Sequence, residues 1–332
     1  MRTTRRSLIK SVGGFAAAAA LPFGIRNASA QANTLTVMTD WAAHGMHAGL
    51  FLAAEKKWFE EAGVNVTILD GKGSSATIQQ AATGQVDIGF AQLAAMAVAR
   101  NNGIPLTSIA CWVRAGDNGV MVPAGKGFKT LKDLKGKKIA YAAASTTGPF
   151  LDAFLAASGV SKSDFEIVNV DASALVSTYS SNSVDAVMST VAFFLPIVEK
   201  SRPSEGIMWA DVGLRLPGYG ATVLPQTLTA KNDALAKFVA AQVKAWEYIQ
   251  SGKVDEAVAA IIAQRSKERL DPVVIKGQLV AYLTLFDTPA SKGKKPGWQA
   301  EEDWTSALTT MEKAGVIKSG WKSADYFTNK YF

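Results

Sequence analysis

Apolar and polar residues alternate near the start of the chain in a pattern that predicts a strand, a helix and a second strand. Residues 35–38 are an apolar run bounded by polar residues, as expected of a buried strand. A helix with one apolar face follows, because apolar residues recur there at a spacing of four: Leu50, Ala54 and Trp58. Gly63 stands where a helix often ends in a left-handed residue, and residues 64–69 read as the next strand.

This order of elements is typical of a βαβ unit, in which the two strands are parallel and the crossover is right-handed. Ligands bind beyond the carboxyl ends of the strands in such sheets. Two loops follow those ends, at residues 40–47 and 71–75. We therefore expect both loops to face one binding site.

Strands and helices continue to alternate along the chain, which predicts an α/β fold. The first series has strands at residues 86–90 and 106–113 and helices at 76–83 and 93–101. A second series has strands at residues 138–142, 165–170, 184–188 and 207–212, with helices at 150–157, 172–180 and 192–200. Beyond residue 231 the pattern is almost wholly helical, with helices at 234–250, 254–264, 272–283 and 301–314.

The two series predict two α/β lobes joined by two crossings, with a ligand cleft between them that closes by a hinge motion. The glycine- and lysine-rich residues 124–138 mark the first crossing, and Gly218, Tyr219 and Gly220 mark the return. Lobe I is accordingly expected at residues 33–121 and 221–332, and lobe II at residues 122–220.

The net charge of +7 does not indicate a nucleic-acid partner. Residues 1–30 hold five basic residues and no acid, so the remaining chain has 30 basic and 28 acidic residues and a charge of +2. Those first residues read as an export signal, with a basic start, a short apolar stretch and Ala28-Ser29-Ala30 as a cleavage site. Residues 4–10 resemble a twin-arginine signal, and general export is the alternative route. We expect cleavage near Ala30 and a periplasmic protein.

The chain has a single cysteine, Cys111, and two histidines, His44 and His47. One cysteine excludes intramolecular disulfides and cysteine-based zinc or iron–sulfur sites. Two histidines three residues apart lack the further ligands that zinc requires, so no metal site is expected. Both lie in the loop after the first strand, where we expect at least one of them to hydrogen-bond a ligand.

Two loops rich in glycine and hydroxyl residues open helices and offer backbone N–H groups to a ligand. Residues 71–76 match G-x-G-x-x-A, but they follow the second strand rather than the first, which argues against a dinucleotide site. The contacts expected from this loop and from its counterpart in lobe II are Gly73, Ser74 and Ser75, and Ser145, Thr146, Thr147 and Gly148. Two such loops facing one cleft would clamp a carboxylate, sulfonate or phosphate, with a plain turn as the alternative at each.

Aromatic residues near predicted strand ends and crossings are candidates to stack on a flat ligand. They are Trp41, Trp112, Phe193, Phe194 and Tyr219, and we expect at least half of them to pack in the core instead. Gln92, which begins a helix, is a further hydrogen-bonding candidate. No G-x-x-x-x-G-K-[ST], G-x-S-x-G or H-E-x-x-H motif occurs, so the motifs indicate no enzyme class and no cofactor.

One ordered set of residues carries a family resemblance. Within residues 39–66 it comprises Trp41, His47, Gly49, Ala54, Trp58, Phe59 and Gly63. This set closely resembles the opening of periplasmic solute-binding proteins of ABC importers, in the branch that takes nitrate, sulfonates, taurine and pyrimidine precursors of thiamine. Lys57 departs from that branch, which often has glycine there. The resemblance implies a type II two-lobe fold, a small-molecule ligand, a monomer, and delivery to a membrane permease with a cytoplasmic ATPase.

The ligand class stays open between two patterns. Trp41 and His47 resemble the members for thiamine pyrimidines, in which aromatic residues sandwich a ring. The paired loops at 73–75 and 145–148 resemble the sulfonate and nitrate members and favour a small organic anion. A fungal pyrimidine synthase shares the fold, but that enzyme works inside the cell with pyridoxal phosphate and a cysteine-rich motif. A protein that presents its ligand to a sensor is a third alternative.

Overall fold

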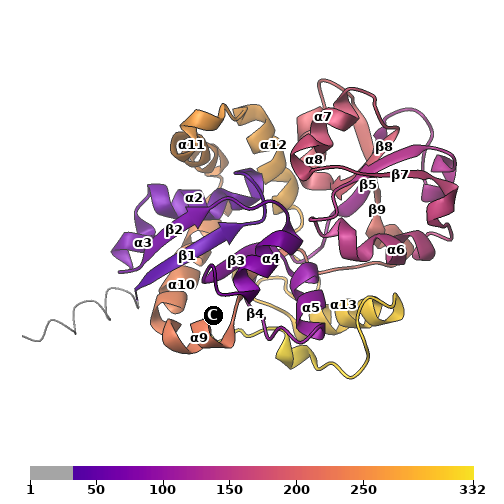
Figure 1. Cartoon of the computed structure of the whole chain (residues 1–332). Helices are drawn as coiled ribbons and strands as arrows, with labels where there is room; N and C mark the ends of the chain where they lie inside the picture. The colour runs from indigo at the N-terminus through magenta and orange to yellow at the C-terminus, as the bar shows by residue number, and fades with distance from the viewer. Residues whose placement is uncertain (1–32) are drawn as a thin grey trace, which may run out of the picture.

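Two lobes, each built on a five-stranded sheet with helices packed around it, lie side by side in the computed structural model (Figure 1). The structure describes residues 33–332, so the predicted export signal lies outside the described residues. The first sheet has the order β2-β1-β3-β10-β4. Its strands are β1 (Thr34–Thr39), β2 (Asn65–Leu69), β3 (Ile88–Gln92), β4 (Thr107–Cys111) and β10 (Tyr219–Val223).

Strand directions in this sheet agree with the predicted βαβ unit. β1 pairs in parallel with both β2 and β3, whereas β10 runs antiparallel to β3 and β4. Of the strands that lie inside the sheet, β3 and β10 are buried at all five residues, whereas β1 is fully buried on one face and partly buried on the other. The carboxyl ends of β1 and β3 therefore meet at one edge of the sheet, beside the second lobe.

The second sheet has the order β7-β6-β8-β5-β9. Its strands are β5 (Asn118–Pro123), β6 (Lys138–Tyr141), β7 (Glu166–Asn169), β8 (Ala186–Thr190) and β9 (Ser204–Met208). β6 is parallel to β7 and β8, and β5 runs antiparallel to β8 and β9. Each sheet thus contains one antiparallel strand adjoining a crossing between the lobes, β5 in one and β10 in the other.

The first crossing lies earlier in the chain than the sequence indicated. Residues 118–121 were expected in lobe I, but β5 belongs to the second sheet, so the chain crosses between β4 and β5. The lysine-rich residues 124–137 connect β5 to β6 within lobe II. Tyr219 and Gly220, expected in the return crossing, are the first residues of β10. The pattern could not place β5, because a strand buried on both faces looks the same in either sheet.

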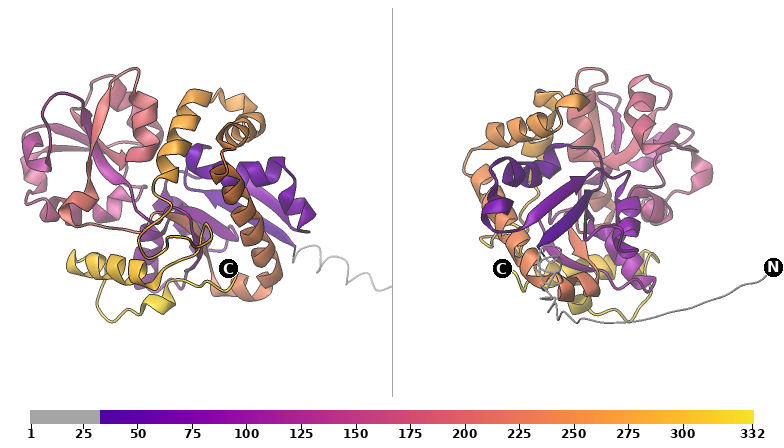
Figure 2. Two further views of the ribbon diagram at one scale, coloured as in Figure 1. Left: turned by 180° about the vertical axis from the view of Figure 1, so that it is seen from behind. Right: turned by 60° about the vertical axis from the view of Figure 1, so that its left-hand side comes forward.

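Helices cover both sheets (Figures 1 and 2). Those of lobe I are α2 (Ala48–Glu55), α3 (Trp58–Glu61), α4 (Ser74–Ala82), α5 (Leu93–Asn101), α9 (Pro225–Ala230), α10 (Asn232–Gln250), α11 (Val254–Gln264), α12 (Pro272–Leu283) and α13 (Glu301–Lys313). Those of lobe II are α6 (Thr147–Ala157), α7 (Leu175–Ser180) and α8 (Val191–Val198). α12 also packs against α8, so a helix of lobe I bridges to lobe II.

The helix predicted to run past Trp58 is in fact two helices. α2 ends at Glu55, Lys57 adopts a left-handed backbone with φ of 58°, and α3 begins at Trp58. Six of the eight residues of α2 are buried, because α10 and α11 cover its outer side. Gly63 has the expected left-handed conformation, with φ of 75°. The helix is interrupted at Lys57 by a left-handed backbone conformation, which glycine adopts more easily than lysine.

Candidate functional site

The candidate site is a cavity between the lobes, where the loops after the strands of both sheets meet. Lobe I lines it with Asp40, Trp41, His44, Gly73, Ser74 and Gln92, and Tyr219 of β10 completes this wall. The opposite wall is formed chiefly by the start of β5, the loop before α6 and the start of α8: Asn118, Ser145, Thr146, Thr147, Thr190 and Phe193. Its position agrees with the rule that ligands bind beyond the carboxyl ends of strands.

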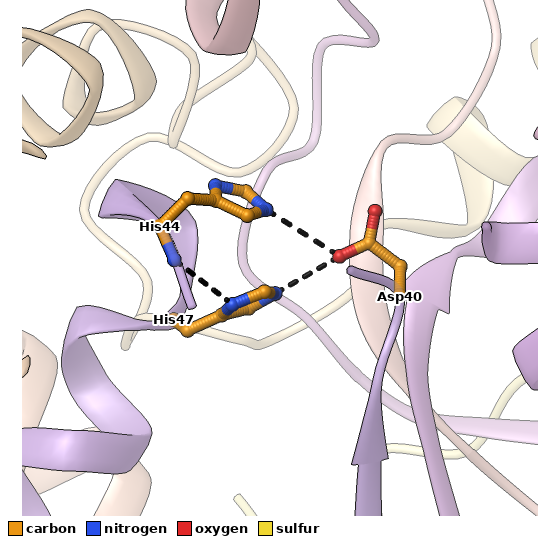
Figure 3. A group of neighbouring side chains, drawn as sticks. All are labelled: Asp40, His44 and His47. Atoms are coloured by element: carbon orange, nitrogen blue, oxygen red, sulfur yellow. Dashed lines mark hydrogen bonds and ion pairs between the residues drawn. The ribbon is translucent and has the colours of Figure 1, made fainter. Parts of the chain in front are cut away.

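Asp40 and the two histidines form one hydrogen-bonded cluster at this wall (Figure 3). His44 caps the short 3₁₀ turn Gly45–His47, with its Nδ1 accepting the N–H of Met46 at 3.3 Å. Nδ1 of His47 accepts the N–H of His44 at 3.4 Å. Because both Nδ1 atoms are acceptors, the neutral rings carry their proton on Nε2. Nε2 of His47 lies 2.9 Å from Oδ1 of Asp40, and Nε2 of His44 lies 3.5 Å from the same oxygen.

This cluster keeps a carboxylate ionised in a buried place. Burial alone would raise the pKa of Asp40, but the hydrogen bonds from His44 and His47 outweigh it and hold that pKa well below its usual range. Burial, together with the neighbouring His47, lowers the pKa of His44 to about 4. At neutral pH the cavity wall therefore presents the negative charge of Asp40 beside a neutral His44.

The same three side chains are a candidate metal site, since their donor atoms lie within 4.8 Å of one another. A metal on Nε2 needs the lone pair of that nitrogen, which would shift the ring proton to Nδ1. In His44 that proton would then face the N–H of Met46, and in His47 it would face the N–H of His44. The backbone geometry therefore favours a hydrogen-bonded carboxylate over a metal ligand set.

A second carboxyl group lies behind the cavity wall. Asp117 is 1% exposed, its Oδ2 accepts the N–H of Ala192 at 2.9 Å, and its Oδ1 has no hydrogen-bond partner among the described residues. Burial raises the pKa of Asp117 to about 7, and the charge of Asp40 adds to this rise. No lysine or arginine is among the cavity residues of the described chain. The site is therefore electrostatically negative.

Comparison with known proteins identifies the family. A family model described as NMT1/THI5 like matches residues 44–252. The chain belongs to the NMT1/THI5-like family.

Two bacterial proteins of similar length are related to this NMT1/THI5-like protein. A putative thiamine biosynthesis protein of Haemophilus influenzae is 27% identical over 293 residues, which are 88% of this chain and 90% of that protein. The formylaminopyrimidine-binding protein of Halalkalibacterium halodurans is 23% identical over 299 residues, 89% of this chain and 90% of that protein. Both similarities therefore extend over nearly the whole of each chain.

A solved structure shows the fold of this NMT1/THI5-like chain. The alkanesulfonate-binding protein of Xanthomonas axonopodis pv. citri, bound to MOPS, has a TM-score of 0.67 at 16% identity, covering 89% of this chain and 98% of that chain. The expected two-lobe periplasmic binding protein fold is thereby confirmed. Within residues 33–332, no helix is both long enough and apolar enough to cross a membrane.

Ten of the fourteen predicted contact residues of this family member line the cavity. They are Trp41, His44, Gly73, Ser74, Gln92, Ser145, Thr146, Thr147, Phe193 and Tyr219. Sequence reasoning missed Asp40, although it directly follows β1, because an acid after a strand carries no signal for its histidine partners. It also missed Asn118, whose Nδ2 donates to Oε1 of Gln92 at 3.0 Å, because β5 was assigned to the wrong lobe.

The other four predicted contacts lie elsewhere. Trp112 is fully buried, and its ring stacks on Phe90 with centroids 5.0 Å apart, so it belongs to the core. His47 is fully buried behind the wall and acts on the site through Asp40. The two remaining residues, Ser75 and Gly148, are explained by backbone contacts of their loops.

Ser75 and Gly148 hold the two predicted loops in place. Oγ of Ser75 donates to the carbonyl of Ser145 at 2.9 Å, which joins the lobes directly. A Cβ on Gly148 would lie 2.1 Å from the carbonyl oxygen of Ala143, so only glycine fits there. Gly73, with φ of 125°, allows a similar approach to lobe II, because a Cβ would lie 2.3 Å from the carbonyl oxygen of Ala144.

Much of the hydrogen-bonding capacity of these loops is already used. Oγ of Ser145 donates to the carbonyl of Ala142 at 2.6 Å and accepts the N–H of Thr147 at 3.1 Å. Pro149 removes a further N–H from the first turn of α6. The hydroxyl of Thr146, in contrast, is buried without a partner among residues 33–332. The hydroxyl of Thr146 is therefore free to bind a ligand.

Proposed function

We propose that this protein is an exported solute-binding protein that captures a small planar heterocycle with N–H donors, of the aminopyrimidine class, and delivers it to an ABC importer. The observation that carries the proposal is the ionised Asp40 at the cavity wall, held by His44 and His47. A buried carboxylate accepts hydrogen bonds from amino and ring N–H groups more strongly than a neutral acceptor does. The similarity to a formylaminopyrimidine-binding protein supports the same ligand class.

The same geometry argues against the organic anion that the paired loops favoured. An anion in the cavity would meet the charge of Asp40, with no lysine or arginine among the described cavity residues to offset it. Ser74, at the start of α4, already directs its Oγ toward Oδ2 of Asp40 at 3.4 Å. A sulfonate or nitrate would have to rely on the remaining backbone N–H groups and on Thr146.

The aromatic residues of the cavity suit a flat ligand. Trp41 is half-buried, lines the cavity and makes no ring contact within the described chain, so one face of its indole is available. Phe193 and Tyr219 contribute further ring surface to the walls. Stacking on a free indole face adds to the apolar area that the ligand buries. We infer that Trp41 and Phe193 lie on the two faces of the ring. Asp40 and Gln92 form hydrogen bonds with the polar groups at its edge.

The binding function is favoured over the synthase chemistry of the fungal enzyme. Cys111 is the single cysteine of the chain and is buried, and burial raises the pKa of its thiol to about 12. Such a thiol is inert as a nucleophile and as a metal ligand. A protein that presents its ligand to a sensor instead of an importer would capture that ligand in the same cavity.

The test is a binding titration of the mature chain from residue 31 with 4-amino-2-methylpyrimidine, taurine, an alkanesulfonate and nitrate. The aminopyrimidine is expected to bind, and Asp40→Asn to weaken it by about 10- to 100-fold, because a hydrogen bond to a charged group contributes about 1.5–3 kcal/mol. Asp325→Asn, an exposed acid remote from the cavity residues, is the control and should leave affinity unchanged. Tighter binding of the sulfonate or nitrate than of the pyrimidine would contradict the proposal.

A further inference from the structure

Gln278 of α12 lies outside the cavity and joins the two lobes through its side-chain amide. Its Oε1 accepts the N–H of Gly45 at 3.1 Å, and its Nε2 donates to the carbonyl of Phe193 at 2.9 Å. Gly45 follows His44 in the site loop of lobe I, whereas Phe193 belongs to α8 of lobe II. The residue is only 1% exposed, so bulk water does not compete for either bond in this arrangement.

Two glycines allow α12 to pack directly on both partners. A Cβ on Gly45 would lie 2.4 Å from the backbone nitrogen of Leu279, and therefore no other residue fits there without a shift. A Cβ on Gly277 would lie 3.1 Å from Cβ of Pro196 in α8. α12 thus lies against the site loop on one side and against α8 on the other, at the junction of the lobes (Figure 1).

Both hydrogen-bond partners of Gln278 are close to the cavity, since Phe193 lines it and Gly45 follows the lining residue His44. His44 and Phe193 line it from opposite lobes, and their rings meet edge-on with centroids 5.0 Å apart. The bond from Gln278 to Phe193 requires α8 of lobe II to lie against α12 of lobe I, as these helices do in this structure. The bond to Gly45 lies within lobe I and does not depend on closure.

We propose that Gln278 is a positioning residue that stabilises the closed lobes and slows release of the solute. Its two hydrogen bonds connect the backbone beside His44 in lobe I to the backbone of Phe193 in lobe II. The side chain lies outside the cavity and does not contact the ligand. The bonds that join the lobes at the cavity itself, such as that between Gln92 and Asn118, are not shielded from an entering ligand in this way. The inference rests on the proposed function in so far as the cleft binds a solute.

Gln278→Glu separates the two bonds of this side chain. The carboxylate still accepts the N–H of Gly45, but it has no N–H for Phe193 and places negative charge beside that carbonyl. Gln242→Glu is the matched control, because Gln242 is also fully buried and donates to a backbone carbonyl, that of Gly49 at 3.2 Å, within lobe I. The control removes the same kind of bond without removing a link between lobes.

The experiment measures the dissociation rate of 4-amino-2-methylpyrimidine and, by X-ray scattering with and without it, the compactness of the wild-type and both variants. Gln278→Glu is expected to release the probe about fivefold to tenfold faster and to populate more open forms, as loss of one buried hydrogen bond implies. Gln242→Glu should lower the melting temperature and leave release and compactness as in the wild-type.

A release rate and compactness of Gln278→Glu equal to those of the wild-type would overturn the inference, whatever the melting temperature does. Failure of the proposed function has a different signature. The wild-type itself would then not bind the probe, while the greater openness of ligand-free Gln278→Glu relative to Gln242→Glu would still report the link between the lobes.

Discussion

Asp117→Asn is expected to stabilise the protein by an amount that grows as the pH rises from about 5 to about 8. In the folded chain burial raises the pKa of Asp117 from 3.8 to about 7. Between these two values the folded state binds a proton at Asp117 that the unfolded state has lost, so the contribution of Asp117 to the stability of the wild-type falls as the pH rises. Asparagine resembles the protonated carboxyl group and carries no such pH dependence.

The magnitude follows from the pKa change. A rise from 3.8 to about 7 corresponds to at most about 4 kcal/mol, because each tenfold change in proton affinity is worth about 1.4 kcal/mol. The groups that face Asp117 electrostatically are Asp40, Tyr219 and Tyr282. Asp40 stays ionised above pH 5 and both tyrosines stay neutral up to pH 8, because their pKa values are shifted away from this range. The change from pH 5 to 8 in the stability difference between the wild-type and Asp117→Asn therefore belongs to Asp117.

The assay is urea unfolding of the ligand-free wild-type and Asp117→Asn at several pH values from 5 to 8. Contributions of all other groups cancel in the difference between the two proteins. The difference in free energy of unfolding should increase with pH by a few kcal/mol and level off above pH 8. A difference that stays constant over this range would refute the reasoning, since it would mean that Asp117 is ionised throughout.

Three further predictions, each tested by one or two substitutions, concern other parts of the structure. Trp41→Ala should weaken binding of the aminopyrimidine by about 1–3 kcal/mol with little loss of stability. Trp58→Ala, away from the cavity, is the control and should leave affinity unchanged. Unchanged affinity of Trp41→Ala with a lowered stability would make Trp41 a core residue. Thr146→Val should weaken binding without lowering the melting temperature. Ser145→Ala should lower the melting temperature, because it removes the hydrogen bond to the N–H of Thr147. If both variants weakened binding equally, the two loops would instead clamp the ligand together. Lys57→Gly should raise the free energy of unfolding by about 0.5–1 kcal/mol, because glycine accepts the left-handed backbone without strain; a loss of stability on calorimetry would contradict that account.

The periodicity of the sequence determined most elements and the place of the site. The helix predicted at residues 93–101 is α5, and the strand predicted at 35–38 lies within β1. The loops at 40–47 and 71–75 do meet at one cavity, because parallel strands end at the same edge of a sheet. Local signals were enough here, since each depends on neighbours along the chain and on which face of an element is apolar.

Tertiary structure alone decided which buried faces meet. Trp112 and Trp41 look alike in sequence, yet one stacks on Phe90 in the core and the other lines the cavity. The ionised state of Asp40 depends on ring orientations that the backbone of the 3₁₀ turn imposes on its two histidines. Gln278 lies 233 residues beyond Gly45, and no pattern along the chain signals that contact. Periodicity reports that a residue is buried, whereas its partner is set by packing between segments that are remote in sequence.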